Sequence, residues 1–117
     1  MIRQAIPQLP SLDLARSRDF YERKLDFVLH RQYEDLIILK RDDIEIHLWH
    51  CTDPAIPQNS SLYFRVSGDI EELYEHCERK GIVRLHLEDR PWGVKEFYVG
   101  DPDGNVLKFG QPSFGVQ

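Results

Sequence analysis

Two segments of this sequence predict helices built in the same way, almost half a chain apart. The first begins at Asp13, whose side chain can cap a helix, and continues to Leu25. The second begins at Asp69 and continues to Lys80, where Gly81 provides a stop. The capping aspartates are 56 positions apart in a chain of 117 residues. This spacing predicts an internal duplication, with two similar halves.

Extended segments surround the two helices in the same order, one before each helix and several after it. The expected strands are residues 3–9, 27–33, 36–40 and 44–50 in the first half, and 61–66, 82–86, 95–99 and 106–109 in the second. Strands grouped after each helix predict an α+β fold with antiparallel pairing inside each half. The expected organisation is a single domain, with module one about 1–51, a linker about 52–60 and module two about 61–117.

Charge and composition exclude several classes of partner. The formal net charge of −5 disfavours nucleic acid and anionic membranes, which both require a basic patch. No apolar run approaches the length of a membrane-spanning helix, and residues 1–10 lack the apolar core of a signal peptide. The two cysteines, Cys51 and Cys77, form no disulfide framework and are expected to be reduced. A cytoplasmic location is therefore expected.

The alternation of residue types with a period of two predicts sheets whose two faces differ in composition and in role. One face of each strand is aliphatic or phenylalanine-rich and is expected to form the core beneath the helices. The other face combines aromatic rings that have polar tips with charges of both signs, a combination typical of a ligand groove or a subunit interface. A solvated face with aromatic cross-strand pairs is the alternative. The residues expected on this face are Glu45, His47, Trp49, Tyr63, Arg65, Glu96, Tyr98 and Lys108.

Three stretches resemble the superfamily of glyoxalases, bleomycin-resistance proteins and extradiol dioxygenases (the vicinal oxygen chelate fold). Residues 13–27 resemble its DL…FY…LGF signature, with Asp26 where the family usually has glycine. Residues 91–97 and 101–109 are similar to the PWGxxEF…DPxGN…F stretch of the bleomycin-resistance branch, and residues 56–74 to the same branch. The combined match covers nearly the whole chain, although the DPDG turn alone would be a generic hairpin.

The resemblance implies two βαβββ modules that form curved mixed sheets, and a homodimer with cups at the subunit boundary. It allows strands to be exchanged between the protomers. The implied activity is sequestration of a drug-like, cationic or aromatic ligand without chemistry, and Trp92 of the PWG stretch belongs to the implied groove. In this interpretation Glu45 and Glu96 would pair with a cationic group. Arg65 and Lys108 on the same face would oppose a cation, which leaves an anionic or neutral ligand as the alternative.

The resemblance also indicates where a metal site would lie, because enzymes of this superfamily bind a divalent metal through residues on four strands. By motif, the four positions are Ile6, His47, Ser61 and Lys108. Only His47 could serve as a ligand, and a catalytic metal needs about three. No metal, cofactor or catalytic residue is therefore predicted. The alternatives are a superfamily enzyme acting on a small carbonyl or epoxide substrate, and an interaction module whose aromatic face is only a dimer interface.

Overall fold

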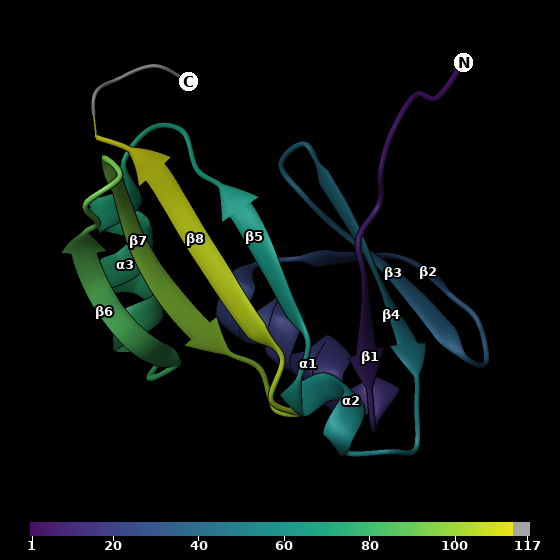
Figure 1. Ribbon diagram of the computed structural model, residues 1–117. Helices are drawn as coiled ribbons and strands as arrows, with labels where there is room; N and C mark the ends of the chain where they lie inside the picture. Colours follow the sequence, from purple (N-terminus) through teal and green to yellow (C-terminus); the bar gives the residue numbers. More distant parts are fainter. Residues whose placement is uncertain (114–117) are drawn as a thin grey trace.

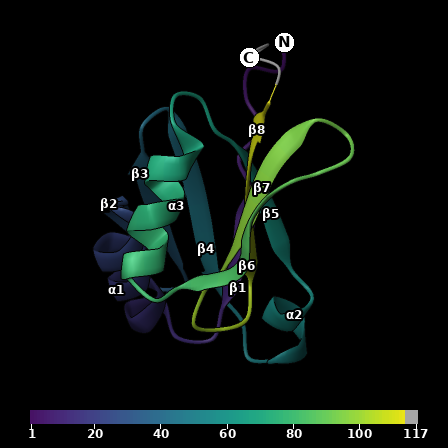
Figure 2. The ribbon, with the colours of Figure 1, turned by 90° about the vertical axis from the view of Figure 1, so that its left-hand side faces the viewer.

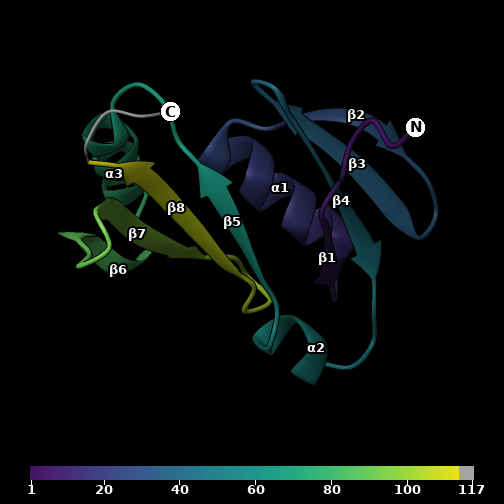
Figure 3. The ribbon, with the colours of Figure 1, turned by 45° about the horizontal axis from the view of Figure 1, so that its top comes forward.

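Two four-stranded sheets, one from each half of the chain, form the framework of the protein (Figure 1). The computed structural model describes residues 1–113. Helices α1 and α3 lie on one side of the sheets (Figure 2), and short helix α2 lies where the chain crosses between them (Figure 3). The elements are β1 (Gln8–Ser11), α1 (Leu14–Leu25), β2 (Val28–Gln32), β3 (Leu36–Arg41), β4 (Ile44–His50), α2 (Ala55–Gln58), β5 (Ser61–Arg65), α3 (Ile70–Arg79), β6 (Val83–Asp89), β7 (Val94–Gly100) and β8 (Val106–Pro112).

Both sheets are mixed and have the same topology, which confirms the predicted pair of similar modules. The strand orders are β1-β4-β3-β2 and β5-β8-β7-β6. Strand β1 pairs with β4 in parallel, and β5 pairs with β8 in parallel, whereas the remaining pairs are antiparallel. The antiparallel pairing predicted inside each half is confirmed for these pairs, and the parallel pair makes each sheet mixed, as the resemblance implied. In each module a helix follows the first strand and carries the chain back to the end of the sheet at which it started. The last strand of the module can therefore run parallel to the first one and pair with it.

The two long helices begin where the sequence predicted. The side chain of Asp13 accepts a hydrogen bond from the backbone N–H of Arg16, and Asp69 accepts from those of Glu71 and Glu72. Each cap satisfies donors that the first turn of a helix leaves free. The end of α3 at Gly81, which has a φ of 73°, is also as predicted.

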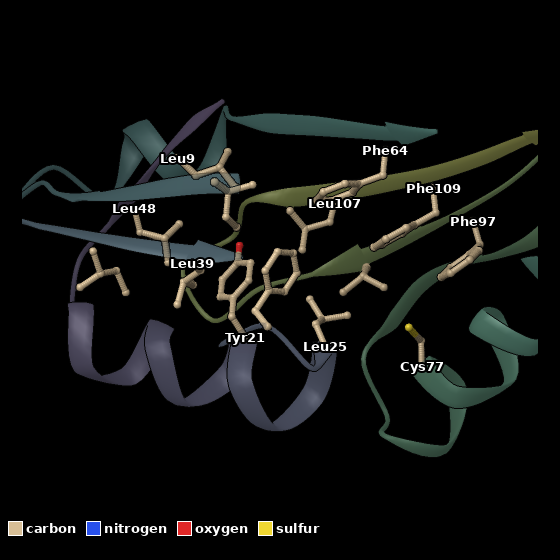
Figure 4. Packing of buried hydrophobic residues seen from close by; sticks show 14 of the residues in the cluster. Leu9, Tyr21, Leu25, Leu39, Leu48, Phe64, Cys77, Phe97, Leu107 and Phe109 are labelled. Atoms are coloured by element: carbon tan, nitrogen blue, oxygen red, sulfur yellow. The ribbon is translucent and has the colours of Figure 1, made fainter. Parts of the chain in front are cut away.

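One continuous core lies between the helices and the inner sheet faces. Tyr21 and Leu25 of α1 lie beneath residues from both modules (Figure 4), and Tyr21 is fully buried. The ring of Phe109 stacks on those of Phe64 and Phe97, with centroids 4.8 and 5.0 Å apart. Because α1 contributes to the packing under both sheets, the orientation of the two sheet faces depends on this shared core.

The DPDGN turn between β7 and β8 is a polar junction between the modules. One carboxylate oxygen of Asp101 accepts the N–H groups of Asp103, Gly104 and Asn105, at 2.9 to 3.1 Å. Its other oxygen accepts the hydroxyl of Tyr21 at 2.8 Å and the side-chain amide of Asn105 at 2.7 Å. Burial is the main reason why the pKa of Tyr21 is raised, and the neighbouring Asp101 raises it further. This motif is thus structural: it holds module two against α1.

Several element boundaries differ from the predictions. The first strand begins at Gln8, so the expected strand over residues 3–9 was wrong for residues 3–7. Pro7 has no N–H to contribute to a ladder, although its carbonyl accepts from His47. The linker over residues 52–60 contains the unpredicted helix α2, which begins after Pro54. Both cysteines are free and buried. Among residues 1–113, no helix is long and apolar enough to cross a membrane.

Candidate functional site

The candidate site is the sheet surface opposite α1 and α3. On the second sheet, the register places Tyr63 of β5 beside Lys108 of β8, and Lys108 beside Tyr98 of β7. The Lys108 ammonium lies 5.3 Å from the centroid of the Tyr98 ring. Tyr63 is 41% exposed, whereas Tyr98 and Lys108 are half-buried. The structure therefore brings together these three predicted residues in one row across the sheet.

In the next row, a glycine gives Tyr63 room to reach a buried carboxylate. Gly110 lies beside Arg65 on one side and Glu96 on the other. A Cβ atom at position 110 would lie 1.8 Å from the Tyr63 hydroxyl, so the ring passes directly over this glycine. The hydroxyl donates to Glu96 Oε2 at 2.7 Å, and the Arg90 guanidinium lies 3.5 Å from Oε1. Glu96 is only 5% exposed, and its carboxylate is satisfied within the sheet.

This arrangement keeps Tyr63 protonated. Burial first, and then the hydrogen bond to Glu96, raises the pKa of Tyr63 to about 12. The guanidinium of Arg65 lies 5.9 Å from the Tyr63 ring centroid. A neutral phenol whose proton is already donated to Glu96 presents its ring face, rather than a free hydroxyl, to a ligand.

The first sheet carries the second group of predicted residues. His47 Nε2 lies 2.8 Å from Glu45 Oε2, and the side-chain amide of Gln8 donates to His47 Nδ1 at 3.2 Å. The hydrogen bond from His47 is the main reason why the pKa of Glu45 is lowered. Lys40 lies 4.0 Å from the other oxygen of Glu45, and Trp49 is half-buried further along β4.

The two groups remain separate within one chain. No hydrogen bond, ion pair or ring contact found among residues 1–113 joins the β4 residues to those on the second sheet. Trp92, in the turn before β7, is 63% exposed. A cavity of about 530 Å³ lies elsewhere, between the end of α1 and the start of α3, and Arg65 is its one lining residue from the predicted site. A closed groove containing all the predicted residues thus needs a further wall.

The family's metal positions do not fit a metal in this chain. Both ring nitrogens of His47 are already within hydrogen-bond distance of Gln8 and Glu45. The position held by Lys108 places an ammonium over a ring, and Ile6 has no donor atom. No group of three or more His, Cys, Asp or Glu side chains within residues 1–113 could hold a metal ion. The chemistry of the side chains at these positions therefore does not fit a metal site.

Three contributors to this surface were not predicted from the sequence. Arg90 pairs with Glu96 from a turn, where no alternation pattern identifies which way a side chain points. Gln8 reaches His47 through the parallel pairing of β1 with β4, whose register no local pattern specifies. Gly110 did carry a signal, because a glycine inside a strand often marks the close approach of another group.

Comparisons with known proteins agree on one family. The pattern of the Glyoxalase/Bleomycin resistance protein/Dioxygenase superfamily matches residues 5–109. A bleomycin resistance protein of Geobacillus stearothermophilus is 32% identical over 127 aligned residues, which cover 92% of this chain and 96% of the relative.

Solved structures give the same result. A bleomycin resistance determinant encoded on the transposon Tn5 is 29% identical and superposes with a TM-score of 0.83, covering 95% of this chain and 98% of the other. A bleomycin-binding protein solved in complex with bleomycin is 31% identical, with a TM-score of 0.82 and coverage of 94% and 98%. The similarity therefore extends over both modules.

Proposed function

We propose, since the chain belongs to the glyoxalase/bleomycin resistance protein/dioxygenase superfamily, that it sequesters a small aromatic, drug-like molecule without changing it chemically. The ligand surface would be the sheet face opposite α1 and α3. The residues that would line this surface are Glu45, His47, Trp49, Tyr63, Arg65, Trp92, Glu96, Tyr98 and Lys108. Bleomycin is the first ligand to test, because the relatives at about 30% identity bind it or confer resistance to it by name.

The observation that carries this proposal is the composition of the uncovered sheet face. Helices α1 and α3 cover the opposite faces (Figure 2), while Tyr63 and Trp92 remain 41% and 63% exposed. Exposure of these apolar ring faces to water is unfavourable. A planar ligand stacked on them buries apolar area and adds aromatic contacts. Lys108 and Arg65 lie over phenol rings and add fixed polar groups that orient a ligand.

A homodimer would supply the missing wall. Among residues 1–113 no hydrogen bond, ion pair or ring contact joins the first-sheet residues to the second-sheet residues, so a cup requires a second surface across from each group. A second copy would provide the first-sheet residues Glu45, His47 and Trp49 opposite the second-sheet residues of its partner. This arrangement would create equivalent cups through two-fold symmetry. The buried free thiols of Cys51 and Cys77 are compatible with the cytoplasmic location that we also propose.

Binding without chemistry is favoured by the state of the titratable groups. Glu96 is held between Tyr63 and Arg90, and Glu45 is held by His47 and Lys40. An acid–base catalyst needs a group free to exchange a proton with the substrate, and a covalent catalyst needs a nucleophile beside a base. These carboxylates instead have structural partners, and neither pair is adjacent to a cysteine or serine nucleophile in the hydrogen bonds of residues 1–113.

The test is an equilibrium titration of the protein with metal-free bleomycin, followed by tryptophan fluorescence in the presence of EDTA. The chain has two tryptophans, so Trp49→Phe and Trp92→Phe each leave a single reporter. We expect saturable quenching at sub-micromolar drug with no metal requirement, consistent with strong protein–ligand binding. Quenching of each reporter would place both residues at the cup.

Trp92→Ala and Trp92→Phe separate ligand binding from assembly. At a ligand wall, Trp92→Ala weakens binding and leaves the oligomeric state unchanged, and Trp92→Phe restores part of the affinity through its ring. A shift to monomer on gel filtration would instead assign Trp92 to a subunit interface. A protein that is folded by circular dichroism but shows no response to the drug would defeat the proposed function, as would turnover of a carbonyl or epoxide substrate in an enzyme screen.

A further inference from the structure

We infer that the cup selects a ligand carrying an anionic group beside its aromatic ring, and that Arg65 and Lys108 are the residues that select it. The inference rests on the proposed function, because it concerns the same sheet face. It chooses between the two signs of charge that the sequence left open, a cation paired with Glu45 and Glu96 or an anion paired with Arg65 and Lys108. Within residues 1–113 the two carboxylates have other partners, and no ion pair joins a carboxylate to either cation.

The carboxylates of the face are already satisfied. Glu96 is 5% exposed, accepts the Tyr63 hydroxyl at 2.7 Å and lies 3.5 Å from Arg90. Glu45 lies 2.8 Å from His47 Nε2 and 4.0 Å from Lys40. A cationic ligand would compete with these partners, and displacing Tyr63 or Arg90 would leave a buried polar group unpaired. Both carboxylates therefore already have polar partners within the protein, although Arg90 also lies 3.3 Å from Glu88.

The cations are in the opposite situation. Within residues 1–113 no carboxylate forms an ion pair with Arg65 or Lys108, although Asp69 and Glu72 line the same cavity as Arg65. Their nearest favourable contacts are ring faces, at 5.9 Å for Arg65 over Tyr63 and 5.3 Å for Lys108 over Tyr98. The register sets Tyr63 beside Lys108, with Arg65 two residues further along the same face of β5. The two cations therefore flank one phenol ring.

A ligand that fills the cup removes water from the two cations, and this desolvation favours a ligand with a negative charge. A ligand stacked on the Tyr63 and Tyr98 rings removes water from the adjacent ammonium and guanidinium groups, and desolvated cations must be paired. A third cation at this point adds repulsion in a less polar environment. A carboxylate or sulfonate instead accepts charge-assisted hydrogen bonds from both groups, and a guanidinium can bind it through two parallel bonds.

The experiment compares two probes that differ in one charged group. Bleomycin A2 carries a cationic tail on its planar bithiazole, whereas bleomycinic acid is the same glycopeptide with a carboxylate at that position. Calorimetric titration of the full chain with each metal-free compound should show that the acid binds about tenfold or more tightly, as expected for a charge-assisted contact. The preference should decrease with added salt, because exposed charges are screened.

Two variants and a control locate the effect. Lys108→Met and Arg65→Gln keep much of the side-chain bulk and should each reduce the preference for the acid several-fold. Lys95→Met is the control: Lys95 lies on the helix side of β7, 3.0 Å from Glu71, so its loss should leave the preference unchanged.

The outcomes separate the inference from the proposed function. Equal affinity for the two compounds, or tighter binding of bleomycin A2, would overturn the inference and leave sequestration intact. A preference that persists in both variants, or that is lost in Lys95→Met, would also overturn it. Binding of neither compound by the folded protein would defeat the proposed function and the inference together.

Discussion

Replacing Gly110 by alanine should disrupt the Tyr63–Glu96 contact without touching either residue. The new Cβ would lie 1.8 Å from the Tyr63 hydroxyl oxygen and 2.6 Å from the ring carbon that bears it. Separations under 3.0 Å require something to move, and Gly110 is part of the β8 backbone between two strands. The Tyr63 ring must therefore swing away and withdraw its hydroxyl from Glu96.

The magnitude follows from the groups that lose contacts. A hydrogen bond to a charged group contributes about 1.5–3 kcal/mol, and overpacking adds about 1–3 kcal/mol where the side chain cannot move freely. The reduced entropy of the unfolded chain with alanine offsets about 0.4–1 kcal/mol. We expect Gly110→Ala to lower the free energy of unfolding by about 2–4 kcal/mol, from the balance of these effects.

Urea denaturation measures this change, and a second glycine provides the control. At Gly100 a Cβ would meet Arg84 along its side chain, at 2.6 Å from Nη1, 2.8 Å from Cδ and 2.9 Å from Cγ, so this exposed arginine must adopt another rotamer. Gly100→Ala should therefore change the free energy of unfolding by less than about 0.5 kcal/mol, as surface changes usually do. Tyr63→Phe, combined with Gly110→Ala, should cost less than the sum of the two single changes, since both remove the same hydrogen bond. A Gly110→Ala protein as stable as the wild type would show that the Tyr63 ring does not depend on the space above this glycine.

Other predictions concern the junction between the modules and the buried ionisable groups. Asn105→Ala removes donors from the Asp101 carboxylate and from a β1 carbonyl, and urea denaturation should show a loss of about 2–4 kcal/mol; a loss under 1 kcal/mol would contradict the role given to this turn. The pKa of Tyr63 is raised from 10.0 to about 12, so its stabilising effect is present below pH 10 and is lost as the pH rises towards 12. Between pH 10 and pH 12 the free energy of unfolding of Tyr63→Phe should accordingly fall less than that of the wild type. If the free energies of both proteins fall in parallel with pH, Tyr63 does not contribute in this way. Burial raises the pKa of Cys77 to about 11, so in a Cys51→Ser protein a thiol reagent near pH 8 should label it only as fast as the chain unfolds; rapid labelling of the native protein would contradict its burial.

Local signals in the sequence were sufficient to predict the helices and the sheet faces. Asp13 and Asp69 predicted where both long helices begin, because an N-cap side chain accepts from backbone N–H groups only a few residues away. Alternation placed Tyr63, Glu96 and Lys108 on one face, because the side-chain period of a strand is two residues. Both kinds of signal depend on short stretches of chain, which the sequence contains directly.

Features that join distant segments were harder to predict. The parallel pairing of β1 with β4 aligns Gln8 with His47, and no local pattern in either strand states its partner or direction. For the same reason, no local pattern predicts the contact of Arg90 with Glu96 or the position of the Tyr63 ring over Gly110. These contacts decide which charged groups on the face have partners, so the sequence alone left the charge of the ligand open.

Native mass spectrometry of the protein mixed with bleomycin in the presence of a chelator reports assembly, binding and chemical change together. We expect a dimer that carries one ligand per protomer, with the released drug unchanged in mass and no metal in the complex. A monomer without ligand, or a released compound of altered mass, would contradict sequestration in cups shared by two copies.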